Sequence, residues 1–488
     1  MLRRKSVSES LAEAERPEHQ LKRTLGAFHL TMMGVGAIVG AGIFSSVGEM
    51  AAGLPGIPGA GPALVLSFVL TAVACGFAAL CYAEIAAMVP IAGSAYTYSY
   101  VSFGELVAWI IGWDLIIEYA IGNIYVAQSW ANYFSSFLQG AFGLDFPAWM
   151  RTDLQTVNSD SALGAIAPHV GDLAIGVNLP AAFVVLALTV ILVIGIRESA
   201  RFNAGMVVFK LAIVLLFIGV GSFFIEPANW KPFMPNGFKG VWTGASLAFF
   251  SYIGFDAVST AAEETANPQR NMPRGMIGSL VICTVLYIAV AGVMTGLVPS
   301  SNLGTVDPLA HALRVAGLER MSVVVAFGAV IAVTSVLLVF QMGQPRIFMA
   351  MARDGLLPPI FGRVHPRFRT PAFGTILTGV FVAVLPTFIT PGQALQLTNI
   401  GTLFAFVLVS GGVIALRSIE PERHRPFRVP GYPVTPVLSI LACLWLMKGL
   451  PASNWWRFGI WLAVGFVIYL FYGSRRSRLA TESRARRD

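Results

Sequence analysis

Charged residues are scarce in this sequence of 488 residues. Asp, Glu, Lys and Arg together make up 12% of the chain, against roughly 25% in soluble globular proteins. Five stretches contain none of these residue types, and each is long enough to cross a bilayer, which takes about 20 apolar residues. They are 50–83, 173–196, 275–306, 321–345 and 371–416. With a hydrophobic fraction of 56% and a mean hydropathy of +0.71, the chain is predicted to be an all-α membrane protein.

Patterns typical of metal sites and of enzymes are also missing. The four cysteines lie in apolar stretches without CxxC spacing, and the six histidines show no ligand spacing. No nucleophile with a matching base and no ATP-binding motif is found. We therefore predict no metal, no cofactor and no enzymatic activity, and any transport would be driven by a gradient.

Apolar runs separated by polar breaks predict about twelve transmembrane helices. Their ranges are 27–51, 60–89, 96–138, 178–196, 201–225, 241–264, 273–298, 320–350, 371–390, 393–416, 433–450 and 454–473. Residues 1–24 are polar and lack the apolar core of a cleavable signal peptide, and 475–488 form a basic tail. Most of the 33 Lys and Arg fall at the two ends and in alternate loops, which predicts an inner-membrane protein with both termini in the cytoplasm. The acidic connection 144–177 is then extracellular.

The first predicted span is rich in glycine, with Gly34, Gly36, Gly40 and Gly42 close together. Each glycine weakens a helix by about 1 kcal/mol relative to alanine, so a helix break is expected here. A break at membrane depth is tolerated where it lines a cavity or is buried in protein, and it therefore indicates a binding site. Its free N–H groups and carbonyls would hold a carboxylate and an ammonium, and they belong to Ile38, Gly40, Ala41, Gly42 and Ile43. The alternative is a packing face of small residues, because Gly36 and Gly40 have GxxxG spacing.

A second break is predicted in span six, where Gly254 and Asp256 interrupt an apolar stretch. Phe250 would cover the substrate as a gate, Tyr252 and Ile253 would supply backbone carbonyls, and Asp256 would hold the broken backbone. Two interrupted helices five spans apart are typical of an inverted repeat. The predicted division of the single domain 25–474 is repeat one at 25–225, repeat two at 241–416 and two appended helices at 433–473.

Lys210 is the only Lys or Arg that cannot be assigned to a loop or to the end of a predicted span. A charge at the bilayer centre costs at least about 2.5 kcal/mol, so it needs a function or a partner. An ammonium here could pack against carbonyls freed at the span-one break and exchange a proton. The alternative is a lysine that extends to the membrane surface, but Lys210 is nine residues, or roughly 13 Å of helix, from Arg201 at the cytoplasmic flank.

Asp114 and Glu118 lie four residues apart on span three and therefore share one helix face. Glu118 is the deeper of the two. It would relay a proton or contact the substrate side chain, and the alternative is a structural carboxylate bonded to neighbouring groups.

A series of segments then carries a resemblance that extends from about residue 20 to 475. The segments are GAIVGAGIF at 36–44, GPALVLSF at 61–68, CYAEIAAMVPIAGSAYTY at 81–98, ARFNA at 200–204, YIGFDAVSTAAEE at 252–264, NPQRNMP at 267–273, RDGLLP at 353–358, LTNIGTLFAF at 397–406 and RPFRVP at 425–430. With them the chain resembles the bacterial cationic amino acid transporter (CAT) branch of the amino acid–polyamine–organocation (APC) superfamily of permeases.

The resemblance implies a LeuT-like five-plus-five inverted repeat in which an amino acid is held between broken helices one and six. The positions it implies for the substrate backbone are Ile38, Ala41, Gly42, Ile43, Phe250 and Ile253. Lys210 falls on the lysine that replaces a sodium site in sodium-independent members and is tied to proton coupling, beside Gly36. Hydroxyls near Thr334 and Ser335 would complete that site. The chain departs from the family at Ala41, where a Thr or Ser is common, and at Pro345, where a kink is expected.

The predicted function is proton-coupled symport of small neutral amino acids such as alanine, because segment 336–342 facing the pocket is apolar except for Gln341. The alternative is a transporter or exchanger of arginine and lysine. A receptor or scaffold has no use for an intramembrane Lys210. The expected partners are the amino acid, protons and membrane lipid, with a small single-helix protein as an option and no nucleic acid. The oligomeric state and the function of 144–177 are left open.

Overall fold

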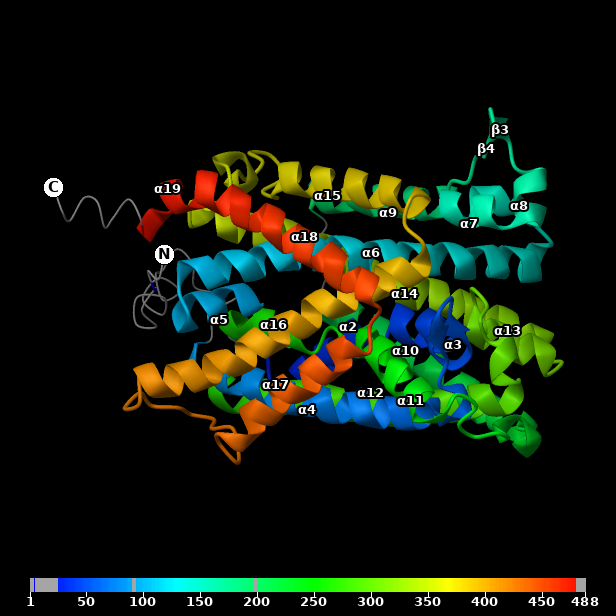
Figure 1. Cartoon of the computed structure of the whole chain (residues 1–488), viewed down its shortest axis with the longest axis horizontal. Coiled ribbons are helices and arrows are strands. Elements are labelled where there is room, and N and C mark those ends of the chain that lie inside the picture. The colour runs from blue at the N-terminus through cyan, green and yellow to red at the C-terminus, as the bar shows by residue number, and fades with distance from the viewer. Residues whose placement is uncertain (1–3, 5–24, 90–93, 196–199, 480–488) are drawn as a thin grey trace.

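The computed structural model describes residues 4, 25–89, 94–195 and 200–479. Of the predicted N-terminal segment 1–24 only Arg4 is described, and the tail beyond residue 479 also lies outside the described residues. Figure 1 shows an elongated bundle in which most long helices run close to the long axis. The segment with α7, α8 and β3–β4 lies at one end of the bundle and α19 at the other. We refer to these as the α7–α8 end and the α19 end.

Helices make up almost all of the described structure, as predicted. They are α2 (Ala27–Ile38), α3 (Val47–Ala52), α4 (Leu64–Met88), α5 (Ser94–Ser102), α6 (Glu105–Phe142), α7 (Leu154–Ser159), α8 (Ser161–Ile166), α9 (Leu179–Ile194), α10 (Ala200–Gly221), α11 (Gly237–Ala248), α12 (Pro268–Leu297), α13 (Pro308–Val315), α14 (Glu319–Arg353), α15 (Ala372–Val384), α16 (Pro391–Ile419), α17 (Val434–Lys448), α18 (Ala452–Ile468) and α19 (Ser474–Arg476). Two short antiparallel pairs stand in loops, β1 (Gly53–Leu54) with β2 (Ile57–Pro58) and β3 (His169–Val170) with β4 (Leu173–Ala174).

The described helices make this a multi-pass membrane protein. Eight of them are long and apolar enough to cross a bilayer, and nine if a bent pair near the N-terminus counts as one span. Three shorter apolar helices, 179–194, 372–387 and 434–448, lie where predicted spans four, nine and eleven were placed. The count of twelve spans and the five-plus-five repeat remain predictions.

Span three differs from its prediction as one continuous segment over 96–138. The structure divides it into α5 and the 38-residue α6, because Gly104 between them has φ of 99°, a left-handed conformation that ends the first helix. The prediction of one uninterrupted span three was therefore wrong.

Pro345 does not end α14, which continues through it to Arg353.

Both glycine-containing spans that were predicted to break lose α-helical geometry at the expected residues. After α2 ends at Ile38, a π-helical turn η1 (Gly42–Ser46) leads into α3, and the two halves are bent by 46°. After α11, two 3-10 segments follow, η6 (Phe249–Tyr252) and η7 (Asp256–Glu264), with Gly254 at φ of 122° between them. Since η1 packs against η6, the two interruptions face each other in the bundle interior.

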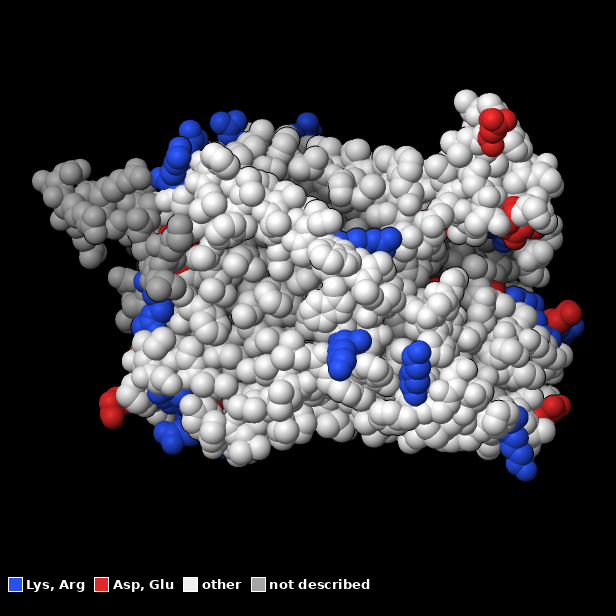
Figure 2. Space-filling model, viewed as in Figure 1, with Lys and Arg blue, Asp and Glu red and all other residues white. Residues whose placement is uncertain are grey.

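Charge differs between the two ends of the bundle. On the face shown in Figure 2, the marked side chains at the α19 end are mostly Lys and Arg, whereas the α7–α8 end carries both signs. Arg4 forms an ion pair of 3.0 Å with Glu420, directly after α16. The same asymmetry was used to predict that the termini are cytoplasmic.

A buried ion-pair cluster at the end of α4 joins two of the sequence segments that carry the family resemblance. Glu84, only 2% exposed, accepts hydrogen bonds from Arg417 Nε at 2.9 Å and from the N–H of Val429 at 2.6 Å. Arg425 Nε lies 3.5 Å from the same carboxylate. Through Arg425 and Val429, the RPFRVP segment therefore binds the loop after α16 to the end of α4.

We expect Glu84→Gln to destabilise the protein by about 3 kcal/mol, because it leaves Arg417 and Arg425 without their buried counter-charge. The midpoint of thermal unfolding in detergent measures this effect. Glu319→Gln, at an exposed residue in the first turn of α14, is the matched control. Equal midpoints for the two variants would show that the cluster contributes nothing to stability.

Candidate functional site

The span-one break lies in close contact with its neighbours, and glycine makes this possible. A Cβ atom on Gly42 would lie 2.5 Å from Ser251 Cα of η6, and one on Gly40 would lie 2.5 Å from Val336 Cγ2 of α14. Gly36 is equally close to Val207 of α10. The small-residue packing that was weighed as an alternative and the break itself therefore coexist at these glycines.

Lys210 on α10 reaches this break, although it is only 1% exposed. Its Nζ donates hydrogen bonds to the carbonyl of Gly36 at 2.7 Å and to that of Val39 at 3.2 Å. Both carbonyls lie where α2 ends and the regular helical bonding stops. The ammonium thus compensates carbonyl groups that would otherwise be unpaired inside the bundle.

Tyr287 on α12 has a related position that sequence reasoning missed. Its hydroxyl donates to the carbonyl of Ile38 at 2.9 Å, next to the two carbonyls held by Lys210. The only signal in the sequence was a tyrosine within the charge-free stretch 275–306, and nothing in that stretch indicates which backbone group it would meet.

The other side of the break offers hydrogen-bond donors. The N–H groups of Gly40 and Ala41 donate to none of the residues that the structure describes, as is usual before the first turn of a helix. They precede η1, so the partial positive charge of this helix start adds to them. An anionic group such as a carboxylate is the natural partner for these donors.

A small central cavity, of about 10 Å³, adjoins this break. Its lining brings together the break, the gate position predicted in η6, and apolar walls from α6 and α14. The lining residues are Ala37, Ile38, Gly40, Ala41, Gly42, Val126, Phe250, Ile253, Val336 and Phe340. No ionisable side chain is among them.

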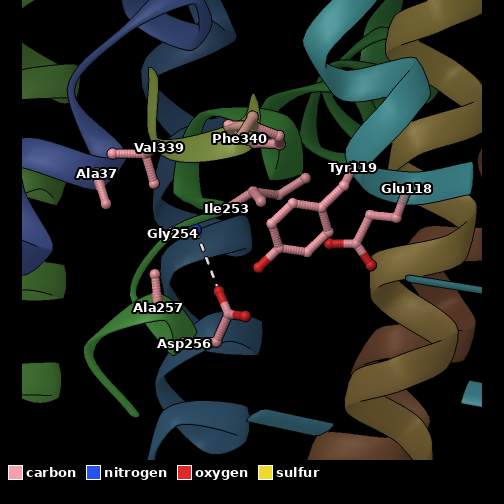
Figure 3. Close-up of a pocket in the computed structure, with 9 residues that line it drawn as sticks. All are labelled: Ala37, Glu118, Tyr119, Ile253, Gly254, Asp256, Ala257, Val339 and Phe340. Carbon is pink, nitrogen blue, oxygen red and sulfur yellow. Dashed lines mark hydrogen bonds between the residues drawn. The ribbon is translucent and has the colours of Figure 1, made fainter. Parts of the chain in front are cut away.

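A second small cavity, of about 20 Å³, shares Ala37, Ile253 and Phe340 with the central one and continues past Gly254. Figure 3 shows the side chains of Glu118 and Tyr119, from α6, and Asp256 directed into it. Asp256 Oδ1 accepts a hydrogen bond from the N–H of Gly254 at 3.2 Å, which holds the interrupted backbone of span six.

The carboxylates of α6 are buried and incompletely bonded. Glu118 is 3% exposed, and its Oε2 has no hydrogen-bond partner among the described residues. Asp114, one turn away, is fully buried, and neither of its carboxylate oxygens has a partner in the described part of the chain. Groups in this state are suited to carrying protons, because an unpaired buried carboxylate is much more costly than a carboxylic acid.

Several predicted residues lie away from the two cavities. Tyr252 is directed towards α4, where its hydroxyl donates to the carbonyl of Phe68 at 3.1 Å. Thr334 accepts a hydrogen bond from Trp130 Nε1 at 2.9 Å, and Ser335 donates to the carbonyl of Ala332. Gln341, the polar residue expected on the pocket side of span eight, instead donates to the carbonyl of Val185 and to Thr189.

Phe250 and Ile253, in contrast, both line the central cavity, and Ile43 is fully buried in η1. Val336 and Phe340 belong to the segment 336–342 that was expected to face the pocket, and both line the central cavity. Sequence reasoning missed Val126, whose only signal was an apolar position on a helix that also carries predicted site residues.

Comparison with known proteins gives matches along nearly the whole chain. The family model described as amino acid permease matches residues 25–471. A methylthioribose transporter of Bacillus subtilis is 46% identical over 98% of both chains. The branched-chain amino acid permease BcaP of the same organism is 45% identical over 98% of this chain and 99% of its own. Cationic amino acid transporter 9 of Arabidopsis thaliana, a chloroplastic protein, is 39% identical over 81% of this chain and 67% of its own.

Proposed function

The chain belongs to the amino acid permease family of the APC superfamily, and on that premise we propose that it carries neutral amino acids across the cytoplasmic membrane together with protons. It is a permease and not an enzyme. The proposed direction is uptake, with the α19 end and both termini in the cytoplasm and the α7–α8 end outside.

The observation that carries this proposal is the pairing of free backbone groups with apolar walls in the central cavity. The N–H groups of Gly40 and Ala41 would bind the carboxylate of an amino acid. Its ammonium would donate to the second lone pairs of the carbonyls at the end of α2, beside the bonds from Lys210 and Tyr287. Its side chain would then meet Val126, Val336 and Phe340. An apolar wall favours an uncharged side chain, because a charge there would be desolvated without a partner.

The size of the side chain is the finer part of the proposal. Alanine is the substrate expected from the sequence, and one similar protein is a branched-chain amino acid permease. The wall is made of aliphatic and aromatic groups, which suits both alanine and the branched-chain residues. Arginine remains the alternative, since Glu118 and Asp256 line the adjoining cavity that Phe340 and Ile253 border.

Protons are the proposed coupling ion. Lys210 supplies an ammonium where a cation is needed to compensate the carbonyls of Gly36 and Val39, and a lysine, unlike a bound sodium ion, can be neutralised by losing a proton. Loss of that proton would weaken the span-one break and couple protonation to the alternating access of a LeuT-like five-plus-five repeat.

Uptake of labelled alanine, leucine and arginine into proteoliposomes, with and without an inward proton gradient, tests this function. We expect accumulation of alanine or leucine only with the gradient, and unlabelled methylthioribose is included as a competitor because one similar protein is a transporter of that compound. Gradient-independent exchange of arginine, without uptake of either neutral amino acid, would contradict the proposal.

A further inference from the structure

A third cavity, of about 220 Å³, is lined by residues of α3 and of the loop before α13, and Figure 1 shows α3 and α13 towards the α7–α8 end of the bundle. We call it the outer cavity. It is formed by η1 and α3, by α6, by the β1–β2 turn, by the loop before α13 and by the start of α16. Its lining residues are Ser45, Glu49, Gly53, Leu54, Pro55, Tyr125, Ser129, Asn132, Gly304, Thr305, Val306 and Pro391.

The outer cavity differs from the central one in its polarity. Glu49 is its only ionisable carboxylate, and no Lys, Arg or His lines it. Within the described part of the chain, the Glu49 carboxyl group accepts a long hydrogen bond, of 3.5 Å, from the hydroxyl of Tyr125. A carboxyl group with so weak a partner has acceptor positions left for the ammonium of a ligand, and the charge of that ammonium would stabilise its ionised form.

Hydrogen-bond donors lie around the same space. Asn132 brings a side-chain amide, and Thr305 Oγ1 is a buried hydroxyl oxygen without a partner in the described residues. A zwitterion needs one anionic acceptor for its ammonium and neutral donors for its carboxylate. The outer cavity provides both kinds of group.

An aromatic pair separates the outer cavity from the central one. Tyr125 lines the outer cavity, Phe250 lines the central one, and their rings meet edge to face at 4.9 Å between centroids. Because the Tyr125 hydroxyl is also the partner of Glu49, a ligand on Glu49 would compete with Tyr125 for the carboxylate. Occupancy of the outer cavity is thereby linked to the residue that closes the path to the central cavity.

We propose that the outer cavity is a first binding site, where Glu49 binds the α-ammonium of an amino acid arriving from outside before the Tyr125–Phe250 pair opens. This inference rests on the proposed function, of which it names an additional step. It assigns Glu49 a role on one side of the membrane only, because Glu49 lines the outer cavity and not the central one.

The test compares uptake of labelled leucine into right-side-out and inside-out membrane vesicles for the wild type and Glu49→Gln. In right-side-out vesicles we expect Glu49→Gln to raise KM about tenfold with Vmax within about twofold, the size expected for losing one charge-assisted hydrogen bond. In inside-out vesicles KM should not change. Glu49→Asp, which keeps the charge, should recover part of the affinity.

Glu226→Gln is the matched control, since Glu226 is exposed and does not line the outer cavity. Vmax is normalised to folded protein measured by size-exclusion chromatography, so a folding defect does not imitate the effect. An unchanged KM in right-side-out vesicles, or an equal rise in both vesicle types, would overturn the outer site while leaving the transport function in place. Absence of both leucine and alanine uptake by the wild type would overturn both proposals.

Discussion

Replacing Lys210 by methionine is expected to lower gradient-driven uptake at least about 100-fold. Methionine has a similar length but cannot donate, so the carbonyls of Gly36 and Val39 lose their hydrogen bonds inside the bundle. Each buried acceptor left without a partner costs about 1–3 kcal/mol, and about 2.7 kcal/mol in the transport-competent state corresponds to a factor of 100. The measurement is the initial rate of uptake into proteoliposomes with an inward proton gradient.

Lys210→Arg separates the structural role of the charge from its role in coupling. Arginine keeps a permanent positive charge for the carbonyls but does not release its proton at any pH that proteins tolerate. We expect this variant to exchange amino acid across the membrane at equal pH while failing to accumulate it against a gradient. Lys239→Met, which removes an exposed charge in the first turn of α11, is the matched control.

Gradient-driven accumulation by Lys210→Arg at the wild-type level would contradict proton exchange at this residue. A normal rate for Lys210→Met would go further, because it would show that the carbonyls of the break need no cation at all.

The fold was largely predictable because long charge-free stretches leave few alternatives to membrane helices. Gly104 shows where that reasoning fails. Composition alone joins 96–138 into one span, and only the left-handed conformation of that glycine divides it into α5 and α6. The glycines of span one, in contrast, could be recognised from the sequence as a helix break, because several of them fall together in an otherwise apolar run.

Contacts between distant helices account for what sequence reasoning missed at the site. Lys210 stood out as a charge in an apolar span, whereas Tyr287, which holds the neighbouring carbonyl, is one tyrosine among twelve. Gln341 was expected at the pocket because it is the polar residue in its segment, but helix periodicity turns it towards α9. Glu49 was not singled out in the sequence, and only the fold brings it beside Tyr125.

Gly42→Ala is expected to reduce uptake at least about 100-fold, although alanine is the better helix former by about 1 kcal/mol. The added Cβ would lie 2.5 Å from Ser251 Cα, a backbone atom that no rotamer change can move away. The two interrupted spans must therefore separate, and since both line the central cavity, its backbone groups lose their common geometry. Initial uptake rates measure the effect, and Gly76→Ala, with nothing within 4 Å of the new Cβ, is the matched control.

Gly40→Ala provides the sharpest contrast, because its Cβ would meet a side-chain atom, Val336 Cγ2, at 2.5 Å. The double variant Gly40→Ala with Val336→Ala should recover uptake, because the conflicting atom is removed. The double variant Gly42→Ala with Ser251→Ala should not recover it, because the conflict there is with the main chain. If Gly42→Ala retained wild-type KM and Vmax, close approach of the two breaks would not be required for transport. Failure of both double variants to differ from their single variants would instead indicate that the glycines act through backbone flexibility and not through packing.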